Sequence, residues 1–535
     1  MIEPFKKNII YSTKILSDLD INLIDAIKDK FSLSCLKTLL SNSFSIECID
    51  DPEIISSYSR DYSNIDGYAD FLVRPCTSRE CAIILRLCTK YNFNLTISAG
   101  KTNLTGSATP NGGVLLSIER LNEYKIKIYR NKMTVSCSPN EYLESLREYI
   151  LDKSNGQLYY PVDPTSRVDA MVSGTISCNA SGFVPGKKGA TRYWVNSIDV
   201  ILTSGYCIRI DRGQYISKNG KFIISQGEKE IEIKIPSYNR PKIKNASGPF
   251  TCSYGEIDFI DLIIGSEGIF GLISRCELKL AKVPSSYIDL FVSLEKEQDA
   301  LSFHASIGKI LNNDYGKISA LEYFGYNCSP FMKNRDYLFK SDDSVGVYLQ
   351  IPLYGITYDE GLEEWYQKLD DFDINIDFDR VLVLKEPKHW KLFFEARHSL
   401  PENALKRAKE LNTISIITDT IVPPQYFSRY LLFVHNLLQT NKIEYLLFGH
   451  LGDCHLHFHL LPSKDKESLA IELYNLIVKE SSKLGGVYSA EHGTGKRKRS
   501  DFLECYGPKA ASELLSTKKV FDPSLILNIG NVINI

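Results

Sequence analysis

Paired cysteines, long apolar runs and an excess of one charge are all missing from this chain of 535 residues. None of its 13 cysteines stands in a C-x-x-C pair, which argues against an iron–sulfur cluster or a zinc ribbon. No run of 18 apolar residues occurs, so the sequence predicts no transmembrane segment. The net charge of −2, without a basic patch interleaved with aromatics, argues against a nucleic-acid partner.

The N-terminus also lacks an apolar core followed by small residues, so we do not interpret it as a signal peptide. Scattered cysteines in such a chain indicate reduced thiols and a cytoplasmic protein. Peripheral attachment to a membrane through the N-terminal arm stays open. A hydrophobic content of 43% is typical of a globular protein, and the length predicts roughly two or three domains.

Histidines are scarce in this chain and concentrated in one place. Four of the nine fall within residues 448–462, and a fifth follows a glutamate in the segment SAEHGTG. Imidazole and carboxylate together suit a divalent transition metal or an acid–base site. These residues are His450, His455, His457, His459, Glu491 and His492.

The spacing of the window predicts a β-strand. His455, His457 and His459 alternate by two and therefore share one face, while Leu456 and Phe458 face the core. The alternative is a polar strand face with no chemistry. A half-buried strand that faces water usually carries threonine or lysine rather than three histidines, which favours the first interpretation.

Small residues gather in four loops, at residues 98–107, 173–182, 244–248 and 261–272. The first lies between two predicted strands and matches neither the P-loop nor the GxGxxG pattern. Exposed backbone N–H groups and hydroxyls in such loops suit a pyrophosphate. Four loops of this kind indicate a long ligand, which fits a dinucleotide better than a mononucleotide.

The texture of the sequence divides the chain into three parts. Residues 1–50 carry apolar positions at helical spacing and predict a helical N-terminal segment. Residues 51–284 alternate short strands, helices and glycine-rich turns. Residues 285–535 read as strands with helices between them, so the predicted fold class is α+β.

Taken in order, VRPCTSREC, TNLTG, DPTS, SGTISCNASG, KNASG, GSEGIFGLIS, GHLGD, SAEHGTG and FDPSLILNIG resemble one family. It is that of the FAD-dependent oxidoreductases of the vanillyl-alcohol oxidase (PCMH) type, within them the D-2-hydroxy acid dehydrogenases. The resemblance runs from Arg74 to Val532. It implies a two-subdomain PCMH-type FAD-binding domain over residues 51–284 and an α+β substrate cap over residues 285–535.

The resemblance also implies which residues bind FAD. Those expected at the pyrophosphate are Gly100, Thr102, Asn103, Thr105 and Gly106. Those expected at the ribityl chain and the isoalloxazine ring are Asp163, Pro164, Ser173, Gly174, Thr175, Asn179 and Ser181. Those expected at the adenine and ribose are Gly265, Ser266, Glu267, Gly268 and Ile273. No histidine precedes His304, which excludes a histidyl link in the first domain and favours non-covalent FAD.

By the same resemblance, His450, His457 and Glu491 are metal ligands, for zinc or alternatively manganese or iron. His492 is the general base, and Arg397 pairs with the substrate carboxylate. The implied reaction oxidises a small D-2-hydroxy acid, such as D-lactate or glycolate, to the 2-oxo acid. The alternative is another alcohol, or a transferase like alkylglycerone-phosphate synthase.

The segment 448–462 departs from the family at two positions. Asparagine is usual where this chain has His455 and His459. They leave the metal identity and the roles of both residues open. No lysine for a second substrate carboxylate occurs around residues 417–419, which disfavours a dicarboxylate. The chain carries no second redox centre, so its electrons go to an external acceptor: a quinone, a cytochrome or an electron-transfer flavoprotein.

Overall fold

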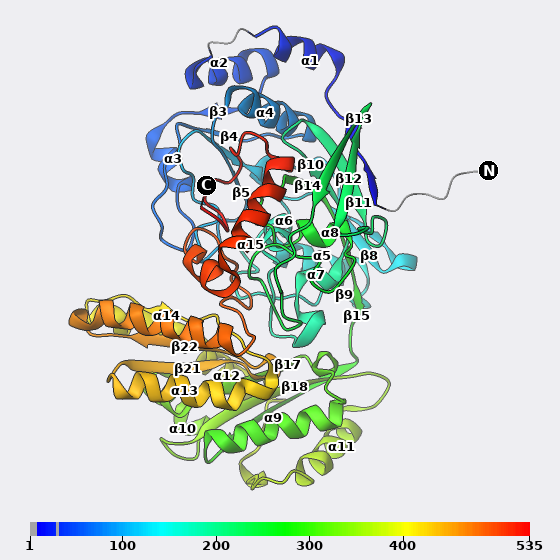
Figure 1. Cartoon of the computed structure of the whole chain (residues 1–535). Helices are drawn as coiled ribbons and strands as arrows, with labels where there is room; N and C mark the ends of the chain where they lie inside the picture. The colour runs from blue at the N-terminus through cyan, green and yellow to red at the C-terminus, as the bar shows by residue number, and fades with distance from the viewer. Residues whose placement is uncertain (1–7, 28–30, 535) are drawn as a thin grey trace.

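The structure of the protein, a computed structural model, describes residues 8–27 and 31–534. It confirms the α+β class: helices and strands form two units, and Figure 1 shows the first above the second. Among the described residues, no helix is both long and apolar enough to cross a membrane.

The N-terminal segment combines helices with edge strands. Ser17 caps the first helix with a capping box, and Ser32 caps the second. The strands before them join sheets formed by residues more than 190 positions later, as Thr13 faces Cys207 and Ile9 faces Ile223. The predicted helical segment therefore forms in part. The elements are β1 (Ile9–Tyr11), β2 (Thr13–Lys14), α1 (Asp18–Asp25), α2 (Leu33–Phe44) and α3 (Pro52–Tyr58).

The first unit contains a small sheet in the order β3-β4-β6-β5, whose last three strands are parallel. Thr77 caps helix α4, which connects β4 to β5 and buries its cysteines and isoleucines in the core. The chain from residue 99 onward leaves β5 as the first of the small-residue loops. The elements are β3 (Cys48–Ile49), β4 (Phe71–Val73), α4 (Ser78–Tyr91), β5 (Leu95–Ser98) and β6 (Val114–Ser117).

A six-stranded antiparallel sheet, in the order β2-β11-β10-β14-β8-β7, completes the first unit. Its remaining strands are β7 (Lys127–Tyr129), β8 (Thr134–Cys137), β10 (Val195–Ile201), β11 (Tyr206–Asp211) and β14 (Leu272–Lys279). Around it lie α5 (Leu143–Lys153), β9 (Leu158–Tyr159), α6 (Val172–Cys178), α7 (Thr191–Trp194), β12 (Lys221–Gln226), β13 (Lys229–Lys234), α8 (Phe259–Ile263) and β15 (Ala281–Lys282).

The second unit is built on a seven-stranded antiparallel sheet, in the order β19-β16-β18-β17-β21-β22-β20. Helices α9, α11, α13 and α14 pack into the core on one face, and α12 covers the other. The strands are β16 (Ser286–Leu294), β17 (Ala320–Phe324), β18 (Val345–Leu353), β19 (Leu382–Val383), β20 (Ile416–Ile417), β21 (Glu444–His450) and β22 (His455–Leu461). The helices are α9 (Glu297–Leu311), α10 (Arg335–Leu338), α11 (Tyr358–Asp370), α12 (Pro387–Glu410), α13 (Phe427–Thr440) and α14 (Glu467–Lys483).

The C-terminal segment returns to the first unit. Helix α15 (Arg499–Phe521), red in Figure 1, buries Phe502 and Phe521 in the same core as Phe259 and Phe270. The loop before it, residues 489–495, crosses between the two units. That crossing places Glu491 and His492 at the junction.

Candidate active site

The hairpin of β21 and β22 determines the positions of the four histidines. His450 ends β21 and pairs with His455 across the turn. Along β22, the alternate residues Leu456 and Phe458 are buried in the core, which confirms the predicted faces. Gly449 makes the close approach feasible: its φ is +145°, and a Cβ there would lie 3.1 Å from Cδ2 of His457.

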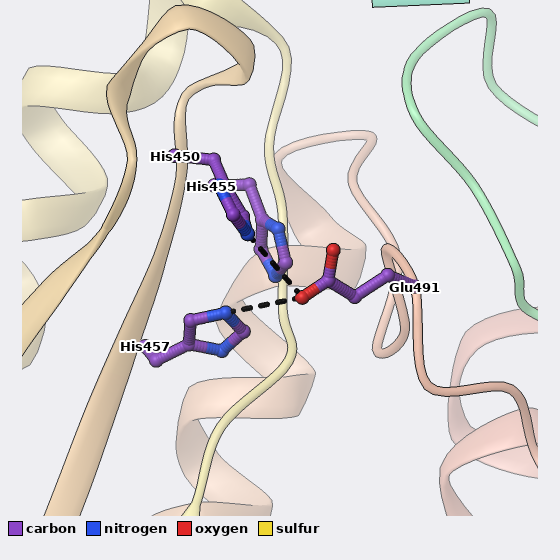
Figure 2. A group of neighbouring side chains, drawn as sticks. All are labelled: His450, His455, His457 and Glu491. Carbon is purple, nitrogen blue, oxygen red and sulfur yellow. Dashed lines mark ion pairs between the residues drawn. The ribbon is translucent and has the colours of Figure 1, made fainter. Parts of the chain in front are cut away.

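Two of these histidines present the same nitrogen to one carboxylate oxygen. Nε2 of His450 lies 3.5 Å from Oε1 of Glu491, and Nε2 of His457 lies 3.3 Å from it (Figure 2). The other nitrogen of each ring is held elsewhere. Nδ1 of His450 lies 2.6 Å from Oε1 of Glu322, and Nδ1 of His457 lies 3.1 Å from the carbonyl oxygen of Thr418.

This arrangement fits a metal site. Zinc bonds of about 2.0–2.2 Å place tetrahedral ligand atoms roughly 3.3–3.5 Å apart, which matches both distances to Glu491. Metal-binding histidines also hold their second nitrogen against a carboxylate or a carbonyl, as His450 and His457 do here. The donor set therefore suits a divalent ion.

Charged neighbours keep the carboxylate ionised. Burial alone would raise the pKa of Glu491, but Lys244 and His450 hold it well below its usual range. Nζ of Lys244 lies 3.2 Å from Oε2 of Glu491 and 3.4 Å from Oδ2 of Asp453. Burial lowers the pKa of His450, yet Glu322 and Glu491 raise it to about 9, so a bound metal would replace a proton there.

His492 lies beside this group and is held by Asp419. Nδ1 of His492 is 3.5 Å from Oδ2 of Asp419, and Nε2 is 3.7 Å from Oε1 of Glu491. Burial lowers the pKa of His492 to about 4, so the ring is neutral at pH 7 and able to accept a proton. Asp419 stays ionised because contacts to its carboxylate, among them the ammonium of Lys498 at 2.9 Å, outweigh its burial and hold its pKa well below the usual range.

Arg397 reaches the same place from α12. Its guanidinium lies 5.2 Å from the ring centroid of Phe183 and 5.4 Å from that of Phe448. Its NH2 nitrogen lies 3.5 Å from Glu322, and its Nε has no hydrogen-bond partner among the described residues. A buried guanidinium with a free donor is well suited to a carboxylate ligand.

A cavity of ≈ 480 Å³ joins these residues to three of the four small-residue loops of the first unit, and the loop 244–248 does not line it. All the residues predicted for metal binding and catalysis line it, and so do most of those predicted for FAD. The exceptions are Thr105, Gly106, Asn179, Gly265 and Ser266. Its size and mixed lining are those of a small-molecule site.

The first loop of the cavity offers donors. In the part of the chain that the structure describes, no protein acceptor takes the backbone N–H of Lys101, Thr102 or Asn103. Successive free N–H groups suit the phosphates of a dinucleotide. Glu267, expected near the ribose, accepts the N–H groups of Thr494 and Gly495 at 2.7 Å each and also lines the cavity.

Sequence reasoning missed the partners that orient the site. These partners are Glu322, Lys244, Thr418 and Asp419, for which the sequence predicts no individual role. One signal was available in the sequence: Glu322 is a charged residue inside the apolar strand 320–324. A buried charge is costly unless it is paired, so such a position indicates a buried partner.

Comparison with known families agrees with both units. Residues 69–211 match the description of an FAD binding domain, and residues 343–532 match that of the C-terminal domain of FAD linked oxidases. The chain belongs to the FAD-linked oxidases. It is therefore an FAD-dependent oxidoreductase, and a cavity lies between its two units.

Several relatives of this FAD-linked oxidase carry names of hydroxy acid enzymes. A D-lactate dehydrogenase of Anaerostipes hadrus is 26% identical over 90% of this chain and 93% of its own length. A D-2-hydroxyglutarate dehydrogenase of Stutzerimonas stutzeri is 24% identical, covering 93% and 97%. The glycolate oxidase subunit GlcD of Bacillus subtilis is 23% identical, covering 86% and 88%.

Solved structures confirm the PCMH-type fold. The 4-ethylphenol oxidase of Gulosibacter chungangensis superposes with a TM-score of 0.65 at 16% identity, covering 97% of this chain and 98% of that one. p-Cresol methylhydroxylase gives a TM-score of 0.65 at 14% identity over the same shares. An alkyldihydroxyacetonephosphate synthase gives 0.62 at 14% identity, covering 98% and 88%.

Proposed function

We propose that this FAD-linked oxidase converts a small D-2-hydroxy acid, of the D-lactate or glycolate type, to its 2-oxo acid. His450, His457 and Glu491 hold a divalent metal, for which zinc is the first candidate. The observation that carries the proposal is the convergence of two imidazole nitrogens on Oε1 of Glu491, at 3.5 Å and 3.3 Å, in the wall of the flavin cavity. An α-hydroxycarboxylate is a chelating ligand, which a site of this kind accommodates.

The metal and the flavin would supply two functions that the side chains do not: activation of the hydroxyl and acceptance of the hydride. When bound, a divalent metal lowers the pKa of a coordinated hydroxyl, and oxidised FAD accepts a hydride at N5. Glu322 and the carbonyl of Thr418 orient the two metal histidines through their Nδ1 atoms. Lys244, beside Oε2 of Glu491, favours the use of Oε1 toward the metal.

His492 is the general base in this proposal. Its ring is neutral at pH 7, and Asp419 holds Nδ1, which leaves Nε2 to accept the hydroxyl proton. Nε2 faces the oxygen of Glu491 on which the metal histidines converge. The base therefore stands next to the group that activates the hydroxyl.

Arg397 receives the substrate carboxylate. Two aromatic faces hold its planar guanidinium, and its free Nε faces no protein acceptor among the described residues. Ile417 also lines the cavity, at the place where some family members use a lysine for a second carboxylate. An apolar side chain there favours a monocarboxylate.

FAD is bound without a covalent link in this proposal. No histidine occurs in the first unit, and burial raises the pKa of the Cys178 thiol, which keeps it protonated and unreactive. All 13 cysteines are free, so no disulfide stores the electrons. They pass from the flavin to an external acceptor.

A substrate panel tests the proposal. The purified holoenzyme is given D- and L-lactate, glycolate, D-2-hydroxyglutarate and a simple primary alcohol, with an artificial electron acceptor, and the 2-oxo acid is measured. We expect turnover of the D-monocarboxylates and little of D-2-hydroxyglutarate. Turnover of the alcohol alone, or of no compound, contradicts the proposal and favours the alcohol oxidase or transferase alternative, which rests only on the shared fold.

A further inference from the structure

His455 is a buried histidine whose two ring nitrogens form no hydrogen bond among the described residues. Its exposed fraction is 0%. Nε2 lies 3.1 Å from Oδ1 of Asp419, without hydrogen-bond geometry. An unsatisfied buried polar group is costly, so a native structure that keeps one usually has a use for it.

The position of the ring suggests that use. The ligand atoms of His450, His455, His457 and Glu491 all lie within 4.8 Å of one another. Figure 2 shows the ring of His455 between His450 and Glu491 in the view. The hairpin register fixes this place, because His455 pairs directly with His450, and its ring centroid lies 4.5 Å from that of His457.

We propose that His455 is a fourth protein ligand, which makes the metal site of this chain three histidines and one glutamate. The substrate then binds as an additional ligand, so the metal takes more than four ligands during the reaction. The inference rests on the metal in the proposed function and goes beyond it. By the resemblance to the D-2-hydroxy acid dehydrogenases, asparagine is usual here, so this ligand is proposed for this chain and not for the family. The four ligand atoms lie within 4.8 Å of one another, so the proposal requires the ring of His455 to approach the other three ligands when the metal binds.

Two other uses of these residues fit less well. Asp419, His457, Glu491 and His492 also form a group within 4.8 Å. There, however, Nζ of Lys498 and Oγ of Ser489 already donate to Oδ2 of Asp419, at 2.9 Å and 2.6 Å. A cation is thus in place where a second metal would bind. A core histidine without a ligand leaves the cost of its Nδ1, which has no hydrogen-bond partner among the described residues, unexplained.

His459 provides the matched control. It is also a histidine where the family usually has asparagine, it is also buried, and it lies on the same face of β22. Its ring stacks on Phe448 with centroids 4.9 Å apart, and it does not belong to the four-residue group. A change at His459 therefore tests for general effects of replacing a buried histidine in this strand.

A third imidazole also changes which metals the site prefers. Imidazole ligands suit zinc, cobalt, nickel and copper, whereas manganese prefers oxygen ligands. We expect the wild-type site to select Zn²⁺ over Mn²⁺ more strongly than a site with asparagine at position 455. Loss of one ligand weakens Zn²⁺ binding by more than the roughly 10–100-fold that loss of an outer-shell partner costs.

The test compares His455→Asn with His459→Asn in the FAD-loaded protein after metal removal. Zn²⁺ affinity is measured by competition with a chromogenic chelator, and the visible spectrum of added Co²⁺ is recorded at wavelengths above the flavin bands. We expect His455→Asn to bind Zn²⁺ at least roughly 100-fold more weakly and to change the Co²⁺ spectrum. His459→Asn should match the wild type in both measurements.

The outcomes separate this inference from the proposed function. If both variants bind Zn²⁺ as the wild type does while His450→Asn loses it, the three-ligand site stands and the role of His455 is overturned. If the wild type itself binds no metal, the proposed metal site fails as a whole. X-ray absorption on the zinc-loaded wild type needs no variant: three imidazoles support the inference, and two overturn it.

Discussion

Asp419 contacts both the backbone and the ring of His492. The backbone N–H of His492 donates to Oδ2 of Asp419 at 3.0 Å, and the ring Nδ1 lies 3.5 Å from the same oxygen. These two contacts fix both the loop and the ring of the proposed base. Oδ2 of Asp419 also accepts Nζ of Lys498, so the carboxylate stays charged inside the protein.

Replacing Asp419 should therefore slow the chemical step. We expect Asp419→Asn to lower kcat roughly 100-fold, because the amide neither orients His492 nor stabilises its protonated ring. KM and FAD content should change little. Ser489→Ala, which removes a hydroxyl that donates to the same oxygen at 2.6 Å, is the control and should retain most of kcat. An unchanged kcat in Asp419→Asn would show that His492 needs no such support.

A change at Arg397 should act on substrate binding. Arg397→Lys loses the planar fork that pairs with a carboxylate, and we expect KM for the hydroxy acid to rise roughly 10–100-fold with a smaller change in kcat. His398→Gln, at the exposed neighbouring position on α12, is the control. Steady-state kinetics with D-lactate, together with thermal stability and FAD content, separate substrate binding from support of the fold. An unchanged KM, or a rise in KM accompanied by loss of stability or of FAD, would argue that Arg397 only supports the fold.

Glu267 should couple flavin binding to the loop that carries Glu491 and His492. Its carboxylate accepts the N–H groups of Thr494 and Gly495 at 2.7 Å and the hydroxyl of Ser107. Removing it in Glu267→Ala leaves buried donors unsatisfied, which costs roughly 2–4 kcal/mol of stability. We expect FAD to be released faster on dilution, and flavin fluorescence measures that release. FAD release and thermal stability equal to those of the wild type would refute the coupling.

The parts of this site that follow from local sequence were predictable. The alternation of residues 455–461 predicted the strand and its two faces, and three of the four small-residue loops predicted to bind a ligand line the cavity. Strand periodicity and turn chemistry act over a few residues, and one chain is enough to read them.

The contacts that orient the site were not predictable, because they join distant segments. Glu322 precedes His450 by 128 residues and meets it only through the pairing of β17 with β21. Within residues 415–423, only Ile416 and Ile417 form a strand, β20, which pairs with β22. The chain then leaves the ladder, and this turns the carbonyl of Thr418 and the carboxylate of Asp419 toward the histidines.

His304 should make the protein less stable in acid. Burial against Tyr315, at a ring-centroid distance of 4.8 Å, lowers the pKa of His304 from 6.5 to about 4. The unfolded chain therefore takes up this proton first, and stability falls as the pH drops from about 6.5 to 4. Up to about 3 kcal/mol is involved.

We expect His304→Phe to lose less stability than the wild type over that pH range, because phenylalanine keeps a ring against Tyr315 and cannot be protonated. Denaturant unfolding of the second unit at pH 7 and at pH 4.5, monitored for both proteins, measures the difference. Unfolding free energies that fall in parallel for the two proteins would show that His304 does not contribute.

The most direct test of the account is anaerobic reduction of the bound flavin, followed at about 450 nm, with D- and L-2-hydroxy acids before and after metal removal. We predict rapid loss of the oxidised-flavin band with a D-2-hydroxy acid, little with its L-form, and none once the metal is removed until Zn²⁺ is restored. Reduction that proceeds unchanged without metal, or that ignores the hand of the substrate, would contradict the proposed roles of His450, His457 and Glu491.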